Sequence, residues 1–520
     1  MIPLTPLRRV RLLFALASGL LLAFGFAPHH VPLVAWLAMA MLVFAALDAR
    51  LPIALACGLL HGTAFYGLTL QWVQGVMQLH GGLSAPAAIG VHALMVLILS
   101  LFPAAFCVAV AWISRRNIAW ACVAAPFLWV ASELGRYHMP AIGFPWNLLG
   151  YAVSDNLGLL QLAALTGIYG LSFLVAAYGA LSAWTLVERS KRAFAWWLAL
   201  TSAVLPVTLV GARFVPSEMP QLVARLVQTN LPQKGYEANW HQQFAAELDE
   251  LERLSIAGAR AEAPPANAAP EGEASNAAEQ GAASSAPTKQ VALIVWPEVP
   301  APFYLQDKRF AERAQRIATQ AQTHFLVGHV DWKPGAEGRL HPYNSAALLG
   351  PGGERLYAYD KIHLVAFGEY VPWRNLLRFA EKMVQEVGDF RAGTERSVGQ
   401  LPNGKFATVI CFEAVFPNEV RQFVSGGAEL LVNISNDGWF GRSAAPDQHL
   451  AMAQVRAVEN RRWLLRATNN GYSVAVDPYG RIVTAMPADA RGRWMCRLRS
   501  AATAHCIHAL ATGWRGCPSW

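Results

Sequence analysis

Three residues in the second half of the chain have the side chains that nucleophilic catalysis needs. Cys411 and Glu298 each come directly after an apolar run, at 406–410 and 291–296, and Lys361 stands among apolar and aromatic residues. A cysteine thiolate is a strong nucleophile, a carboxylate can take up its proton, and an ammonium group can stabilise an oxyanion. Taken singly, Cys411 could be a small buried hydrophobe and Glu298 a solvated carboxylate. Taken together, the three predict a nucleophile, a general base and a cation in one site.

Alternating strands and helices must position these residues. From residue 214 to about 492, short β-branched runs alternate with amphipathic stretches, which is typical of a layered α/β domain. A nucleophile at a strand end is exposed while nearby backbone N–H groups can face an oxyanion. We expect strands at 222–227, 291–296, 325–330, 346–349, 407–411, 430–434 and 473–476, and helices at 242–254, 307–320 and 447–466.

The segment 258–290 interrupts this alternation. It is rich in Ala, Pro, Glu, Ser and Asn and has no apolar periodicity. Because strands continue on both sides, we interpret it as a disordered surface insertion and not as a domain boundary.

Residues 1–213 have the composition of a membrane bundle. They hold 11 Lys and Arg and 4 Asp and Glu, whereas the remaining 307 residues hold 31 and 30. The soluble half shows no basic face, so nucleic-acid binding is not expected. The first apolar run could also be a cleaved signal peptide, but six further spans favour an uncleaved helix. Seven runs are long and apolar enough to span a bilayer, at 10–28, 31–48, 52–73, 86–113, 118–135, 158–185 and 194–213.

The basic residues of this half predict its orientation. Arg136 and Arg213 fall on one side, and nine others fall at the N-terminus or in even-numbered connections. By the positive-inside rule the N-terminus is cytoplasmic, and seven spans then place the α/β domain outside the cytoplasm. The nine are Arg8, Arg9, Arg11, Arg50, Arg115, Arg116, Arg189, Lys191 and Arg192.

The connection 133–156 is long and lies on the outer side of the expected bundle. It contains Gly143-Phe144-Pro145-Trp146-Asn147, a string of aromatic and turn-forming residues. Such residues suit an aromatic anchor at the membrane interface. They could also form one side of an entrance for a lipid that comes from the bilayer.

No metal or cofactor is expected from the sequence. It contains no CxxC, HExxH, GxSxG or phosphate-binding glycine loop. The residues His363, Asn436, Asp437 and His449 do not have the spacing of a zinc site, and we interpret them as structural hydrogen-bonding residues.

Several strings of the second half resemble the carbon–nitrogen hydrolase (nitrilase) superfamily. In that superfamily, Glu, Lys and Cys occur in this order, next to the ends of strands. The resemblance implies that this half of the chain folds as a four-layer αββα sandwich. The matching strings are Ile294-Val295-Trp296-Pro297-Glu298, Tyr359-Asp360-Lys361-Ile362-His363-Leu364, Val409-Ile410-Cys411-Phe412-Glu413, Asn433-Ile434-Ser435-Asn436-Asp437-Gly438-Trp439-Phe440 and Gln448-His449…Arg456…Glu459-Asn460-Arg461.

Such a domain behind seven spans, with the string Phe367-Gly368-Glu369-Tyr370-Val371-Pro372 and the 143–146 loop, resembles one family closely. That family is the bacterial apolipoprotein N-acyltransferases. The resemblance implies a membrane enzyme of the bacterial inner membrane with its catalytic domain in the periplasm. It implies phospholipid, with phosphatidylethanolamine as the expected donor, and diacylated apolipoproteins as partners. Acyl transfer would pass through a thioester on Cys411, without a cofactor.

The same resemblance implies supporting and substrate-binding residues. Glu369 matches a second carboxylate of the family site that orients Lys361, and Glu413 matches a functional position beside the nucleophile. Trp240 matches a tryptophan in contact with lipid or substrate, although simple packing stays an open interpretation. Phe144 and Trp146 are expected to line the lipid entrance.

The C-terminal residues 493–520 depart from the family, which ends with an eighth span. The longest charge-free stretch, 501–514, is short and polar for a span, and three of the seven cysteines crowd into this tail. We therefore expect an atypical tail, of the kind that a reading-frame change near Arg491 would produce.

Two other functions fit parts of the sequence. A membrane-tethered amidase or nitrilase would use the same three residues and pass its acyl group to water. Activity on a soluble amide without lipid would favour it. A non-enzymatic transporter or scaffold would have lost part of the triad, and all three residues are present.

Overall fold

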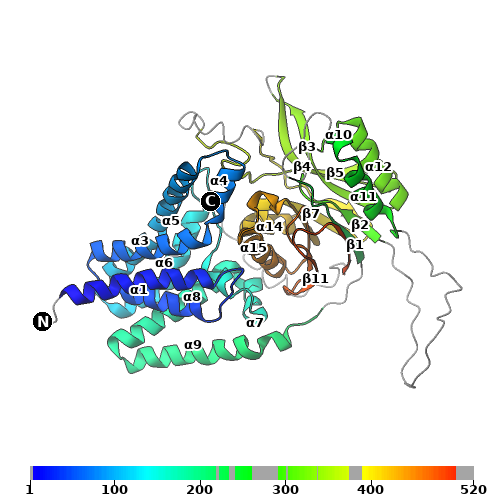
Figure 1. Cartoon of the computed structure of the whole chain (residues 1–520). Helices are drawn as coiled ribbons and strands as arrows, with labels where there is room; N and C mark the ends of the chain where they lie inside the picture. The colour runs from blue at the N-terminus through cyan, green and yellow to red at the C-terminus, as the bar shows by residue number, and fades with distance from the viewer. Residues whose placement is uncertain are drawn as a thin grey trace, which may run out of the picture.

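The structure of the chain is a computed structural model. It describes residues 4–217, 222–232, 240–259, 291–299, 303–335, 338–373 and 389–498. Figure 1 shows two parts, a bundle of helices coloured blue to cyan-green and a domain with sheets coloured green to red. The expected insertion at 258–290 lies almost wholly outside the described residues, which resume at the start of the next strand.

The first part of the chain folds into the helices that its apolar runs predict. Every one of the seven expected spans overlaps a helix, and the short helix α4 follows α3 without having been expected. The helices are α1 (Leu4–Phe24), α2 (Val34–Ala46), α3 (Leu51–Thr69), α4 (Trp72–Leu79), α5 (Ala85–Ser114), α6 (Ile118–Tyr137), α7 (Leu157–Leu160), α8 (Ala163–Glu188) and α9 (Lys191–Val210), with short 3-10 turns η1 (Leu149–Val153) and η2 (Gly211–Phe214).

Five helices of the described chain are long and apolar enough to cross a membrane: Leu51–Thr69, Ala85–Ser114, Ile118–Tyr137, Ala163–Glu188 and Lys191–Phe214. α2 is apolar but shorter. The bundle also presents large apolar side chains outward, including Leu94, Phe127 and Leu165. Such a surface is expected where the surrounding solvent is lipid. The number of spans, seven, stays a prediction.

Small residues bring α3 and α5 into close contact. A Cβ on Gly58 would lie 2.3 Å from the Ala104 Cα, and a Cβ on Gly62 would lie 2.7 Å from the Ser100 Cα. Gly58 and Gly62 are one helical turn apart, so together they form a small-residue face. Membrane helices associate through such faces, because lipid gives no hydrophobic drive for helix contact.

The second part contains two six-stranded sheets of described strands. Their orders are β12-β1-β2-β3-β4-β5 and β11-β10-β9-β8-β7-β6. The strands are β1 (Leu222–Gln228), β2 (Val291–Val295), β3 (His324–Pro334), β4 (Leu340–Leu349), β5 (Arg355–Asp360), β6 (Gly399–Leu401), β7 (Gly404–Ile410), β8 (Leu430–Ser435), β9 (Trp463–Thr468), β10 (Ser473–Val476), β11 (Ile482–Met486) and β12 (Gly492–Leu498).

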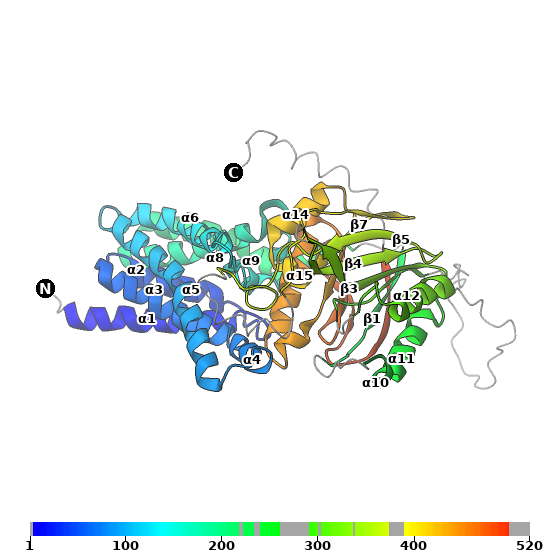
Figure 2. The ribbon, with the colours of Figure 1, turned by 90° about the horizontal axis from the view of Figure 1, so that it is seen from above.

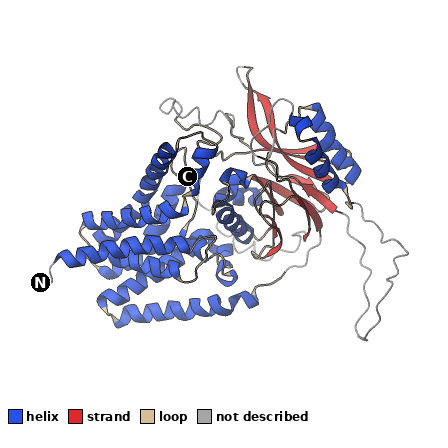
Figure 3. Ribbon diagram, in the orientation of Figure 1, coloured by secondary structure: helices blue, strands red, loops and turns tan. Residues whose placement is uncertain are grey.

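Helices cover the outer face of each sheet. α11 (Ala245–Ile256) and α12 (Lys308–Ala321) contact the β1–β4 side, and α14 (Pro417–Ser425) and α15 (Ala445–Asn460) contact β7 and β9. Strands β1 and β4 of the first sheet contact β9 and β7 of the second. Figure 3 shows the strands enclosed between these helices. The αββα sandwich expected from the sequence is therefore confirmed.

β1 illustrates how the sequence specifies this layering. Val223 and Val227 pack in the cluster under α11 and α12, whereas Leu222, Ala224 and Leu226 belong to the core between the sheets. Successive side chains of a strand point to opposite faces, so a strand buried on both sides is mostly apolar. The polar residues of β1, Arg225 and Gln228, are buried and donate to backbone carbonyls.

Several element boundaries differ from those expected, and strands β5, β6, β9, β11 and β12 were not expected. The helix expected over 447–466 ends at Asn460, because Arg461 adopts a left-handed conformation with φ 50°. Residues 463–468 form β9 instead, parallel to β8. The sheet also continues past 492, since β12 pairs antiparallel with β1 from Gly492 to Leu498. The remaining tail, 499–520, lies outside the described residues. The expectation that it is atypical and forms no ordinary eighth span stays a prediction.

Candidate active site

Cys411 sits at a sharp turn where β7 ends and the 3-10 turn η4 (Cys411–Val415) begins. Its φ of 50° is unusual for a residue with a side chain. Such strain at a strand end is typical of nucleophiles that must project from a sheet edge. β7 lies beside the parallel strand β8, so the residues after β8 reach the same edge. The side chain is 6% exposed.

Lys361 and Glu298 are in direct contact, as the sequence predicted for a common site. The Lys361 Nζ donates to Glu298 Oε1 at 3.2 Å and to Glu369 Oε1 at 3.0 Å. All three side chains are buried. Glu298 also accepts from the Asn436 backbone N–H at 2.9 Å through Oε2, and Glu369 accepts from the Val365 N–H at 2.8 Å.

Asn344 completes this charged group and was not singled out from the sequence. Its Nδ2 lies 2.7 Å from both Glu298 Oε1 and Glu369 Oε1. Its backbone oxygen accepts from the Lys361 N–H at 2.8 Å. The expected strand 346–349 stopped short of it, and β4 begins at Leu340. Nothing in the sequence pointed to it, because the residues just before Ala346 are mostly polar and include Pro342.

The charges in the site act on the pKa values of Lys361 and Cys411. Burial alone would lower the pKa of Lys361, but the Glu298 and Glu369 carboxylates outweigh it and raise that pKa, so the ammonium stays charged. Burial raises the pKa of the Cys411 thiol, and the Glu298 charge adds to the rise while Lys361 opposes it. The resting thiol is therefore protonated at neutral pH and lies in the field of a carboxylate that can receive its proton.

Glu413 holds the nucleophile turn to the segment that carries Lys361. Its Oε2 accepts from the Ile410 N–H at 2.7 Å, and its Oε1 accepts from the Tyr359 hydroxyl at 2.7 Å and the Ile362 N–H at 2.6 Å. The side chain is fully buried. Glu413 thus connects β7 to the end of β5 and faces no open space, which makes it a positioning residue.

A second buried group lies behind the nucleophile. Asp437 accepts from Arg466 Nη2 at 2.7 Å and from the Ser435 hydroxyl at 2.8 Å. His449 Nδ1 lies 3.2 Å from Asp437 Oδ1, and its Nε2 lies 3.1 Å from the Cys411 carbonyl oxygen. Burial would raise the pKa of Asp437, but chiefly the Arg466 charge outweighs it and lowers that pKa. The sequence predicted hydrogen bonding by Asp437 and His449, but it did not predict the role of Arg466.

A large cavity of about 1600 Å³ contains Glu298, Lys361, Glu369 and Cys411 and extends into the helical bundle. This exceeds the roughly 300–1,000 Å³ of ordinary small-molecule pockets. The bundle contributes apolar residues of α4 and α5, and the domain contributes the loop after Lys361. The bundle lining includes Trp72, Val73, Val76, Met77, Val91, Leu94, Met95, Ile98 and Leu99.

Phe144 and Trp146 both line this cavity, and their positions differ. Phe144 is half-buried and stacks on Trp146, with ring centroids 6.0 Å apart. Trp146 is 1% exposed, and its Nε1 donates to Gln448 Oε1 at 2.7 Å across the junction of bundle and domain. Phe412, next to the nucleophile, stacks on Trp146 as well. Trp240 begins the short helix α10 (Trp240–Gln243), and its side chain lies outside the described residues.

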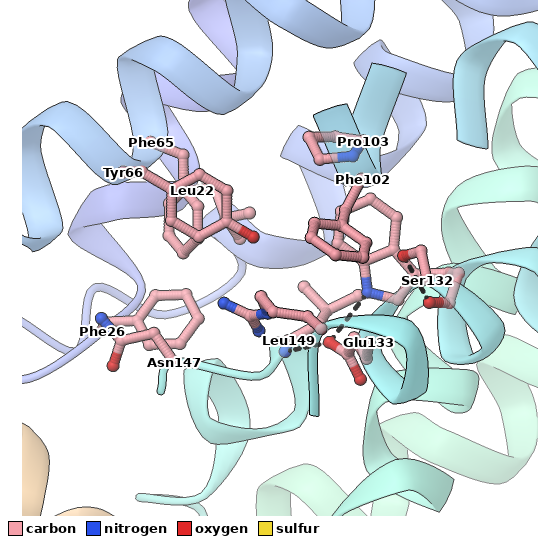
Figure 4. Close-up of a pocket in the computed structure, with 12 residues that line it drawn as sticks. Leu22, Phe26, Phe65, Tyr66, Phe102, Pro103, Ser132, Glu133, Asn147 and Leu149 are labelled. Atoms are coloured by element: carbon pink, nitrogen blue, oxygen red, sulfur yellow. Dashed lines mark hydrogen bonds between the residues drawn. The ribbon is translucent and has the colours of Figure 1, made fainter. Parts of the chain in front are cut away.

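A polar cluster inside the bundle holds this aromatic loop in place (Figure 4). Glu133 Oε1 accepts from the Trp129 Nε1–H at 3.0 Å and from the Leu149 N–H at 2.6 Å. Arg136 donates to the Trp146 carbonyl at 2.8 Å. The pocket around them is only about 10 Å³, room for one water. The cluster is therefore a support for residues 146–149 and not a ligand site.

Among the described residues, no group of three or more His, Cys, Asp or Glu side chains is placed to hold a metal ion. The site brings together side chains that can themselves take part in chemistry. It offers a thiol, a carboxylate, a cation and a cavity that is apolar on its bundle side.

The second half of the chain is a carbon–nitrogen hydrolase domain. The family model described as Carbon-nitrogen hydrolase matches residues 224–504, more than half of the chain. A solved amidase from Nesterenkonia sp. is similar to it at 20% identity, with a TM-score of 0.37, over 57% of this chain and 98% of that one. A second family model, the Apolipoprotein N-acyltransferase N-terminal domain, matches residues 18–181.

Relatives over nearly the whole chain specify the family further. A protein of Geobacter metallireducens named Apolipoprotein N-acyltransferase is 36% identical, over 90% of this chain and 86% of its own. One of Methylococcus capsulatus with the same name is 32% identical, over 92% and 88%. The chain belongs to the apolipoprotein N-acyltransferase family. It is a membrane-bound acyltransferase that modifies lipoproteins, as the sequence resemblance implied.

Proposed function

We propose that Cys411 is the nucleophile, Glu298 its general base and Lys361 the cation that stabilises the oxyanion, and that the acyl donor is phosphatidylethanolamine. The single observation that carries this assignment is one cavity that contains all three groups and continues into apolar residues of the bundle. A lipid with its chains in the bilayer can reach such a cavity with its ester bond at the thiol.

In the first step the Cys411 thiol gives its proton to Glu298 and its sulfur attacks an acyl ester carbonyl of the phospholipid. The carbonyl oxygen becomes an oxyanion, which the Lys361 ammonium stabilises. When the C–O bond breaks, the leaving alkoxide takes the proton from Glu298 and departs as a lysophospholipid. The acyl chain remains as a thioester on Cys411.

In the second step the α-amino group of a diacylglyceryl-cysteine attacks the thioester. Glu298 takes a proton from the attacking amine, the C–S bond breaks, and the thiol regains a proton. The products are an amide on the lipoprotein N-terminus and the free enzyme. A thioester reacts more readily with an amine than with a hydroxyl group. The acyl chain therefore passes on to the lipoprotein and does not return to the lysophospholipid.

Glu369 and Asn344 keep Lys361 and Glu298 in place during these steps. The Asn344 amide joins both carboxylates at 2.7 Å, and Glu369 shares the ammonium at 3.0 Å. Phe144 would contact the acyl chain near the thiol, and Trp146 supports it from behind. Trp240 remains a candidate for substrate contact.

We place the enzyme in the bacterial inner membrane with the α/β domain on the periplasmic side. The distribution of Lys and Arg along the first 213 residues supports this orientation. Both substrates are anchored in a bilayer, so a site that opens toward the bundle suits them.

The test uses detergent-purified full-length protein, phosphatidylethanolamine and a synthetic diacylated lipopeptide, with intact-mass analysis of peptide and enzyme. The wild type should add one acyl chain to the peptide, and Cys411→Ala should add none. If the Cys411→Ala enzyme still transferred an acyl chain to the peptide, Cys411 would not be the nucleophile. Release of free fatty acid with the peptide unchanged would instead indicate a membrane-tethered hydrolase.

A further inference from the structure

His449 makes a hydrogen bond that the acyl-transfer chemistry above does not use. It lies on α15, is fully buried, and its Nε2 is 3.1 Å from the carbonyl oxygen of Cys411. Its other nitrogen, Nδ1, lies 3.2 Å from Asp437 Oδ1 and 3.1 Å from Arg466 Nη2. These contacts place a buried imidazole directly behind the backbone of the nucleophile.

The neighbours of the ring decide where its proton lies. A carbonyl oxygen only accepts hydrogen bonds, and a guanidinium nitrogen only donates them. In the neutral form that accepts from Arg466 at Nδ1, the proton is on Nε2 and faces Cys411. In the charged form, which donates to Asp437 as well, Nε2 also carries a proton. Burial and the Arg466 charge lower the pKa of His449, which favours the neutral form.

The position of the Cys411 carbonyl sets the direction of the next N–H. In a trans peptide the C=O and the following N–H point to opposite sides. His449 holds the Cys411 carbonyl toward α15, so the Phe412 N–H is directed to the other side. Cys411 and Phe412 both line the cavity.

We propose that His449 is a positioning residue that fixes the Cys411–Phe412 peptide so that the Phe412 N–H donates to the acyl oxyanion alongside Lys361. This proposal rests on the proposed function, because it needs Cys411 to be the acyl-accepting thiol. Cys411 has a φ of 50°, and a strained turn needs a fixed partner to hold its peptide in one orientation. Asp437 and Arg466 in turn hold the imidazole, and Trp146 packs against it with ring centroids 5.6 Å apart.

The discriminating variants are His449→Gln and His449→Met. Their side chains have similar length and shape, but only Gln has a donor that can reach the Cys411 carbonyl. The first readout is the rate of lysophospholipid release in a single turnover with phosphatidylethanolamine in detergent micelles. The second readout is alkylation of Cys411 by iodoacetamide, followed on the Cys411 peptide by mass spectrometry.

The two readouts separate positioning from general damage. Acylation passes through an oxyanion, whereas alkylation attacks a saturated carbon and forms none. We expect His449→Met to lower acylation about 10- to 100-fold, below the roughly 100- to 1,000-fold cost of deleting an oxyanion donor outright. Alkylation should stay near the wild-type rate, and His449→Gln should recover most of the acylation.

His329→Met is the matched control. His329 is another fully buried histidine of the α/β domain; its Nδ1 lies 3.2 Å from the carbonyl oxygen of the adjacent Val330, and among the described residues no hydrogen bond joins it to Cys411. It should leave both rates near those of the wild type. If His449→Met does not fold, His449→Asn takes its place, because its amide is too short to reach the Cys411 carbonyl.

Equal acylation in His449→Met and the wild type would overturn the proposal, as would a parallel fall of acylation and alkylation. Failure of the wild type itself to release lysophospholipid would instead count against the proposed function. The two failures are therefore distinguishable in one experiment.

Discussion

At the scale of single residues, the site is built around a thiol that does not ionise by itself. Burial raises the pKa of Cys411, and the negative charge of Glu298 raises it further. A free cysteine ionises near pH 8.5. The thiolate therefore has to form within the reaction, by transfer of its proton to Glu298. A raised thiol pKa also protects Cys411 from oxidation and other reactions while no lipid is bound.

Glu298→Gln should change two reactions of this thiol in opposite directions. Without the carboxylate, Lys361 exerts the largest remaining charge effect on Cys411, so the thiol pKa falls and more thiolate exists at each pH. Iodoacetamide should therefore alkylate Cys411 faster than in the wild type, in which alkylation rises with pH beyond about 8.5. Acylation by phosphatidylethanolamine should fall about 100- to 10,000-fold, because the general base is lost.

The measurement compares the two rates across a pH series on the same preparations. Thermal unfolding in detergent checks that the variant folds. Slower alkylation in Glu298→Gln would contradict the view that Glu298 raises the thiol pKa. Unchanged acylation would contradict its role as the base.

At the scale of secondary-structure elements, α15 is the helix on which the two halves of the chain meet. Gln448 on α15 accepts from Trp146 Nε1 at 2.7 Å and donates to the Thr69 carbonyl at 3.2 Å. Further along, Glu459 Oε1 accepts from the Ile168 N–H at 2.7 Å, where α8 is kinked at Gly167. The same helix carries His449 behind the nucleophile. A shift of the bundle against α15 would therefore reach the active site.

Gln448→Met should weaken this junction. The change leaves the buried Trp146 N–H without its acceptor, and a buried unsatisfied polar group costs about 1–3 kcal/mol. Trp146 stacks on Phe412 next to Cys411, so loosening it should also lower the acylation rate. Thermal unfolding in detergent and single-turnover acylation measure the two effects.

Gln454→Met on the same helix is the control for this change. Gln454 donates to the Gly480 carbonyl at 2.6 Å, a bond within the α/β domain. The Gln454→Met variant should be less stable than the wild type, but its acylation rate should fall by no more than about twofold, as expected for a substitution far from the site. If both variants lose acylation equally, the junction has no special effect on the site.

The elements also show how far the sequence could specify this site. Apolar runs predicted the strands that lead to Glu298 and Cys411, because a buried parallel strand needs an unbroken apolar stretch. They did not predict that α15 ends at Asn460, since Arg461 breaks the helix without Gly or Pro nearby. The hydrogen bonds of Asn344 to both carboxylates could not be predicted from the sequence either. Its position depends on β4 and β5, which lie beside each other only in the folded sheet.

At the scale of the whole molecule, the active site faces the bundle and the charged connections lie away from it. Figure 2 shows the N-terminus at the end of the bundle that is remote from the α/β domain. α9 runs along the bundle and leads toward β1 of the domain. Arg136, one of the two basic residues expected on the domain side, is buried and supports Trp146. The exposed positive charge of this half is therefore even more one-sided than the sequence count indicated.

This asymmetry predicts opposite exposure of two surface positions, Arg116 between α5 and α6 and Arg442 in the α/β domain. Both are exposed, so a cysteine at either can react with a reagent that reaches it. The positive-inside rule places Arg116 in the cytoplasm and Arg442 outside. In spheroplasts, a membrane-impermeant maleimide should label Arg442→Cys and should label Arg116→Cys only after detergent is added.

Labelling is quantified on the two engineered peptides by mass spectrometry, because the chain has seven cysteines of its own. Each variant should keep wild-type acyl transfer, since neither position lines the cavity. The reverse labelling pattern would place the α/β domain in the cytoplasm. A cytoplasmic domain would leave the cavity beside the inner leaflet, and the lipoprotein substrates would then have to reach the enzyme before they cross the membrane.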